Sequence, residues 1–236
     1  MKSIIQCLAL GCCMTAHAAQ QLVVPGGLEN VEGNSSSADL FVNGIAHLQQ
    51  VFSSSEFAFG APTGRIDGIS FRLDSGTGQN FVGLWPGVTV YMSTTSRSPD
   101  SLSPAFSDNI GSDVIRVFGG SLGIFATSAG AEPRPFEVRI RFGTPFFYDP
   151  STGNLAIDVL ALGTTGLTLD AQFAAGDSIG RVWANPDALT GTVDTLGLVT
   201  RFDITPIPEP SSSIFWLVGI ATLCFLSHRR MRSRKV

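Results

Sequence analysis

Residues 136–142 read FEVRIRF, so that four apolar side chains alternate with three charged ones. A period of two places successive side chains on opposite faces of an extended chain, which is typical of a β-strand with one buried face. The same alternation occurs in five other stretches, at residues 69–73, 88–92, 122–126, 155–159 and 198–204. Residues 45–51 fit either a strand or a single helical turn. No long amphipathic helix is predicted.

Clusters of Gly, Pro, Asp, Asn and Ser separate these runs, as expected for turns. They lie at residues 60–64, 74–78, 85–87, 149–154 and 185–187. Short strands at regular spacing with turn signals between them predict an all-β fold, either an antiparallel β-sandwich or a jelly roll. We expect this fold over residues 19–205, which are enough to bury one full core.

The N-terminus predicts a signal peptide over residues 1–18. Lys2 provides a positive charge, residues 4–14 are mostly apolar, and the small residues Ala16 and Ala18 fit a cleavage site just before Ala19. A lipoprotein signal is the alternative, because Gly11 precedes Cys12. The match is poor, since the two residues before Gly11 have the wrong sizes for that signal.

The C-terminal tail, residues 206–236, carries three elements in a fixed order. Pro208 and Pro210 flank Glu209 and favour an extended backbone. The uncharged apolar run of residues 214–226 follows, and a basic cluster ends the chain: Arg229, Arg230, Arg232, Arg234 and Lys235. A helix over the run would span about 20 Å at about 1.5 Å per residue, less than the roughly 30 Å of a bilayer core. We expect a short transmembrane helix with its basic end in the cytoplasm.

This order resembles the PEP-CTERM sorting signal of exported proteins in Gram-negative bacteria. The resemblance implies that an exosortase-like processing enzyme cuts the chain near Pro208-Glu209-Pro210. It further implies an inner-membrane precursor with its domain in the periplasm, and later delivery to the cell surface or extracellular matrix. Residues 93–95, 102–111 and 145–155 are also similar to segments of other PEP-CTERM ectodomains, which implies a recurrent all-β module without an assigned activity. An ordinary tail anchor is the alternative for the tail.

Cysteines and charges exclude several classes of function. The four cysteines are Cys7, Cys12, Cys13 and Cys224, so residues 19–205 contain no disulfide, thiolate metal site or cysteine nucleophile. Nine arginines, no lysine and eighteen acidic residues give that region a net charge of −9. Without a basic cluster we expect no nucleic-acid partner.

Few residues of the domain suggest chemistry. Residues 119–123 match the G-x-S-x-G pattern of serine hydrolases, but a Gly-rich hairpin is favoured, because a strand rather than a helix follows and His47 is the domain's sole histidine. The loop residues Asp108, Asn109 and Asp113 are a weak calcium candidate outside the EF-hand spacing. Trp85 precedes Pro86-Gly87, and we expect it on an exposed loop as a glycan contact.

From these features we expect a non-catalytic surface or matrix protein that associates with exopolysaccharide or biofilm and requires no cofactor. Two alternatives from other classes stay open. One is a secreted carbohydrate-active enzyme of the glycoside hydrolase class, whose paired carboxylates can be distant in sequence. The other is a structural surface subunit that self-associates through sheet edges.

Overall fold

A computed structural model of the chain describes residues 18–37, 44–58, 60–78, 80–163, 167–185 and 187–207. The predicted sorting motif, transmembrane segment and basic end, together with most of the predicted signal peptide, lie outside these ranges. Within them, no helix is long and apolar enough to cross a membrane.

The described chain is built from strands, with three short 3-10 helices, η1 (Ser54–Glu56), η2 (Pro99–Ser101) and η3 (Phe106–Asn109). The strands are β1 (Gln20–Val24), β2 (Ser35–Ser37), β3 (Gly44–Phe52), β4 (Thr63–Phe71), β5 (Phe81–Thr95), β6 (Ile115–Ala126), β7 (Val138–Tyr148), β8 (Asn154–Gly163), β9 (Leu169–Phe173), β10 (Ile179–Ala184), β11 (Thr192–Asp194), β12 (Leu196–Leu198) and β13 (Thr200–Ile207). All their pairings are antiparallel. The predicted all-β class is therefore confirmed.

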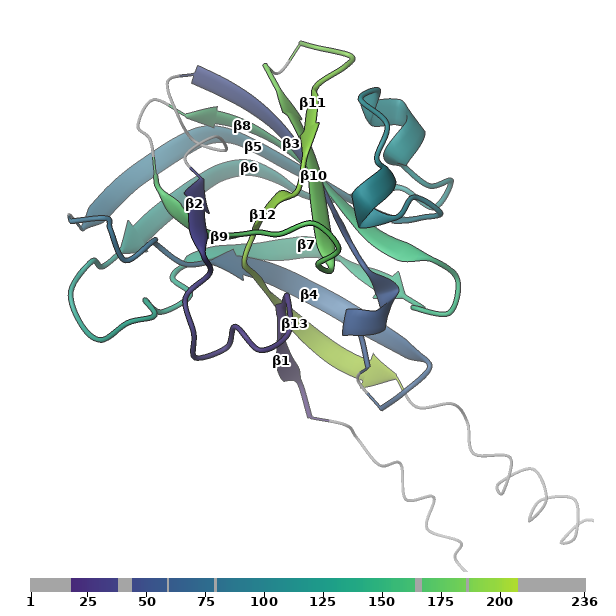
Figure 1. The fold of residues 1–236 in the computed structure, drawn as a ribbon, viewed down its shortest axis with the longest axis horizontal. Coiled ribbons are helices and arrows are strands. Elements are labelled where there is room, and N and C mark those ends of the chain that lie inside the picture. The colour runs from purple at the N-terminus through teal and green to yellow at the C-terminus, as the bar shows by residue number, and fades with distance from the viewer. Residues whose placement is uncertain are drawn as a thin grey trace, which may run out of the picture.

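The strands form three sheets (Figure 1). A six-stranded sheet has the order β11-β10-β3-β8-β5-β6, and a four-stranded sheet below it has the order β1-β13-β4-β7. A small sheet of β12, β9 and β2 lies beside them. Most neighbours in these sheets are far apart in sequence. Thr63 at the start of β4, for example, pairs with Ile207 at the end of β13.

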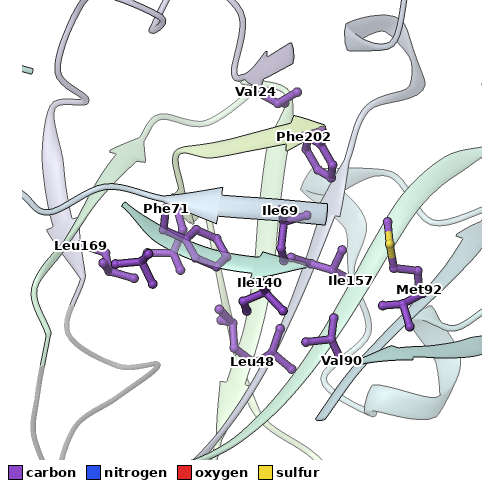
Figure 2. Close-up of a cluster of buried hydrophobic side chains, with 14 of the residues drawn as sticks. Val24, Leu48, Ile69, Phe71, Val90, Met92, Ile140, Ile157, Leu169 and Phe202 are labelled. Carbon is purple, nitrogen blue, oxygen red and sulfur yellow. The ribbon is translucent and has the colours of Figure 1, made fainter. Parts of the chain in front are cut away.

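One hydrophobic core lies between the two larger sheets. Figure 2 shows side chains of both sheets converging there, with Ile69 and Ile140 from the four-stranded sheet and Val90 and Ile157 from the six-stranded one. Phe52 of β3 and Phe202 of β13 meet edge to face, with ring centroids 5.0 Å apart. Burying apolar side chains from both sheets in one cluster supplies the main stabilisation of such a fold.

Residues 138–142 of the stretch FEVRIRF form the start of β7, as their alternation predicts, and Phe136 and Glu137 precede the strand. Val138 and Ile140 are fully buried, whereas Arg139 and Arg141 are exposed on the other face. Residues 45–51 belong to β3, which selects the strand of the two possibilities left open.

Two predicted turns are wrong. Trp85-Pro86-Gly87 lies within β5. Trp85 pairs with Leu122 and Val88 pairs with Gly120, so that Pro86 and Gly87 together lie opposite the single residue Ser121. This β-bulge accommodates a proline, because an extra residue in a bulge need not donate to the ladder. The glycines at 119, 120 and 123 likewise lie inside the continuous strand β6 rather than in a hairpin turn.

The outer face of the six-stranded sheet carries a second, smaller core. Val51 and Val182 contact Leu102 and Phe106, which belong to the segment of residues 96–114 that crosses this face. Asp158 is buried on this face for the same reason. Its carboxylate binds Nε2 of His47 at 2.7 Å.

The two ends of the described chain lie side by side. β1 pairs with β13, with Gln20 opposite Ile204. Since the strands are antiparallel, the start of β1 and the end of β13 reach the same end of the domain. Gln20 and Ile207 therefore both lie at one end of the domain.

Candidate functional site

A groove of about 440 Å³ lies between β6 and β7, the strands at the edges of the two larger sheets. Small-molecule sites usually measure about 300–1,000 Å³. Four consecutive residues of each strand line it: Arg116, Val117, Phe118 and Gly119 from β6, and Arg141, Phe142, Gly143 and Thr144 from β7. The groove is thus shaped by two strands that belong to different sheets.

Irregular pairing at both strands forms the groove. In β7, residues 142–145 have no partner in β4, because Arg141 pairs with Gly68 while Phe146 pairs with Ile66. In β6, Val117 is an extra residue, since Arg116 and Phe118 pair with the adjacent residues Tyr91 and Val90. Bulges are common at sheet edges and re-aim the side chains beside them. Here both bulges fall at the groove.

Two glycines keep the groove open. A Cβ atom at Gly119 would lie 3.5 Å from Cδ and Nε of Arg116, so this guanidinium stem lies along the bare backbone of its own strand. Across the groove, a Cβ at Gly143 would lie 3.9 Å from the carbonyl oxygen of Val117. Side chains at these two positions would occupy part of the space between the strands.

The nine arginines of the domain differ in how their charges are compensated. Five of the nine arginines form ion pairs with carboxylates: Arg65, Arg72, Arg97, Arg134 and Arg181. Arg139 and Arg201 donate hydrogen bonds to the carbonyl oxygen of Phe136. The other two, Arg116 and Arg141, are exposed and have neither a hydrogen bond nor an ion pair with the described part of the chain. Both line the groove.

Trp85 is not a surface residue, and its predicted exposure is wrong. The side chain is 1% exposed and belongs to the core between the sheets. Its ring lies 5.8 Å from that of Phe81. The bulge after Trp85 keeps the indole on the inner face of β5, so it cannot offer a stacking platform to a glycan.

The three residues of the weak calcium candidate also make contacts within the fold, and Asp108 accepts a hydrogen bond from the hydroxyl of Ser103. Asn109 is fully buried, and its amide binds Gln49 of β3 at 2.9 Å and the backbone of Ser103 at 2.8–2.9 Å. Asp113 accepts a hydrogen bond from the backbone of Thr94. These contacts fasten the segment of residues 96–114 to the six-stranded sheet.

An acidic cluster lies elsewhere, beside the small sheet. Glu32, Asp74 and Asp170 each place a carboxylate oxygen within 4.8 Å of the others. Arg72 binds one of them, with Nη2 at 2.6 Å from Asp170 and both side chains inaccessible to solvent. Burial raises the pKa of Asp170 to about 6, although the charge of Arg72 and its hydrogen bond act in the opposite direction. Because the Arg72 guanidinium already pairs with Asp170, the cluster resembles an internal ion pair more than a metal site.

The serine-hydrolase pattern has no geometric support. Ser121 donates its hydroxyl to the carbonyl oxygen of Pro86 on the neighbouring strand, whereas His47 binds Asp158 and stacks on Phe106 at 3.6 Å. In a nucleophile elbow the serine would lie on a turn between strand and helix. Here it lies in mid-strand.

Comparison with known proteins gives no relative: no protein-family model, curated protein or solved structure matches the chain.

Proposed function

We propose that this chain is an exported surface or extracellular-matrix protein, sorted by an exosortase-like enzyme, that associates with exopolysaccharide without cleaving it. The observation that carries the sorting part is the order of elements after Ile207: the Pro208-Glu209-Pro210 motif, a short apolar run and a basic end. In this proposal the domain is a β-sandwich or jelly roll held first at the inner membrane and then released towards the matrix.

The arrangement of the chain ends supports this route. Ala18 and Ala19 are exposed and directly precede β1, so a signal peptidase could reach a site between them. β13 ends at Ile207, immediately before the motif. Because β1 and β13 are paired neighbours, both processing sites would lie at the membrane-facing end of the domain, with the opposite end free for contacts.

The groove between β6 and β7 supports the binding part of the proposal. It offers two unpaired guanidinium groups in a domain whose net charge is −9. The acidic cluster does not suit a glycosidase, whose general acid and second carboxylate must both reach the sugar. Asp170 is buried and bound to Arg72, so it cannot serve as either group.

The self-associating alternative also has an observation in its favour. Val82, Leu84 and Phe125 are 73%, 64% and 61% exposed, and Val82 pairs directly with Phe125 across β5 and β6. Exposed apolar neighbours of this kind mark contact surfaces. Self-association would increase the valency of a matrix component and is compatible with binding to a polymer.

Replacing Pro208, Glu209 and Pro210 together with alanine is expected to leave export intact and to trap the protein in the inner membrane. The reason is that the extended prolyl motif next to the short apolar run would no longer fit the processing enzyme. The measurement is the mass and location of the mature protein in host strains with and without exosortase. A matched control replaces Ser211, Ser212 and Ser213 with alanine and is expected to be processed normally.

Identical mature masses in the two strains would refute exosortase sorting. Normal processing of the alanine variant in the exosortase strain would refute the role of the motif.

A further inference from the structure

We propose that the groove between β6 and β7 binds the carboxylate groups of an acidic, uronate-containing polysaccharide. This inference rests on the proposed function and names the class of ligand. Its starting point is the position of Arg116 and Arg141, which face one groove from two different sheets and lack partners in the described structure.

The charge of the groove favours an anion. Every other arginine of the domain has a carboxylate or a carbonyl oxygen within reach. Arg116 and Arg141 therefore keep their donors available, and guanidinium groups bind carboxylates with paired, charge-assisted hydrogen bonds. The domain has a net charge of −9, so its surface as a whole repels anions. At the groove, the two guanidinium groups attract an anion.

The remaining lining suits a sugar. Phe118 and Phe142 line the groove, and both are half-buried and pack against the core. Aromatic rings pack against the apolar faces of sugar rings. Thr144 adds a hydroxyl that can donate to or accept from a sugar hydroxyl. The glycines 119 and 143 expose backbone along the groove, so an extended chain could approach closely.

The small number of cationic groups argues against a nucleic acid as the ligand. Binding to a phosphate backbone depends on many cationic contacts, each releasing counterions, and only two are present. The net charge of −9 repels a nucleic acid and a polyuronate alike, since each carries about one charge per unit, so it does not separate them. A polyuronate presents carboxylates on rings that can also contact Phe118 and Phe142.

The affinity of one groove is expected to be weak and sensitive to salt. Arg116 and Arg141 are exposed, so water and ions screen their interactions with a ligand. Retention on a matrix would then come from many copies on one polymer. Weak single-site binding also allows the protein to redistribute along the polymer.

The test measures binding of the full chain in detergent micelles to polygalacturonate oligosaccharides, with dextran as the neutral polymer and oligodeoxythymidylate as the nucleic acid. The groove variant combines Arg116→Gln and Arg141→Gln. The matched control combines Arg65→Gln and Arg139→Gln, which remove the same charge from exposed positions outside the groove lining. The groove variant is expected to lose about tenfold in affinity, equivalent to about 1.4 kcal/mol, and the control less than about twofold.

Equal losses in the two variants would overturn the inference, because they would reflect general charge attraction. Absence of polygalacturonate binding by the wild type, or tighter binding of oligodeoxythymidylate, would overturn it as well. The proposed function is tested separately by the fraction of wild-type protein recovered with the host's matrix. If the wild-type protein is recovered with the matrix but the groove variant binds polygalacturonate normally, the proposed function stands and the groove is refuted as the binding site.

Discussion

Arg72→Met is expected to lower the free energy of unfolding by about 3–5 kcal/mol at pH 7.5. The methionine fills the space of the arginine stem, since Arg72 is only 1% exposed, but it removes the cation that pairs with Asp170. Asp170 would then be a buried charge beside Glu32 and Asp74, with its backbone contact to Gly33 as the remaining compensation. Urea unfolding followed by circular dichroism measures the change.

The loss of unfolding free energy in Arg72→Met is expected to become smaller as the pH falls. In the wild type the pKa of Asp170 is already raised to about 6 by burial. A carboxyl group with a raised folded-state pKa binds more protons in the folded than in the unfolded protein, so its contribution to stability is present at low pH and is lost as the pH rises through about 6. Removing Arg72 raises this pKa further, and protonation at pH 5 should recover part of the stability.

Arg65→Met is the matched control for this prediction. Arg65 forms its ion pair with Asp67 on the exposed outer face of the four-stranded sheet. Such a pair contributes roughly 0–1 kcal/mol, so the same substitution should cost less than about 1 kcal/mol and show no recovery at pH 5. Comparable losses for both variants, or a loss in Arg72→Met that grows at pH 5, would contradict the buried ion pair.

The fold class was predictable because alternation is a local property of the chain. FEVRIRF shows which residues of β7 face the core without any knowledge of what lies opposite them. The partners were not predictable. β4 pairs with β13 and β7, and nothing in the sequence of residues 63–71 specifies strands about 75 and 140 residues further along.

Burial on the outer face of the six-stranded sheet was likewise not predictable from local sequence. Asp158 alternates with apolar residues, and by local pattern its side should face water. The segment of residues 96–114 covers it, and Asn109 fastens that segment through Gln49. A loop rich in Asp and Asn looks alike in sequence whether its oxygens bind a cation or its own backbone, so the calcium prediction had no means to separate the two.

The groove was missed for a different reason. Arg116 and Arg141 lie in separate strands of separate sheets, and both appear in the sequence as exposed residues of ordinary strands. The sequence does not show that these two arginines lack partners, because that depends on the contacts of the whole fold. It also does not show that they line one groove, because the two bulges beside it appear only in the strand pairing. The glycines of residues 119–123 are the one visible signal in the sequence, and a Gly-rich run favours a hairpin turn as much as a groove.

Trp85→Ala is expected to lower the free energy of unfolding by about 3–5 kcal/mol. The indole is among the largest fully buried side chains of the core, and a cavity of its size cannot close without moving β5 against β6. Phe125→Ala, on the exposed face of β6, is the matched control and should change stability by less than about 0.5 kcal/mol. Binding of polygalacturonate, measured where both variants are still folded, should match the wild type, because neither residue lines the groove. A stable Trp85→Ala protein that has lost polysaccharide binding would restore the tryptophan as a glycan contact and would refute its place in the core.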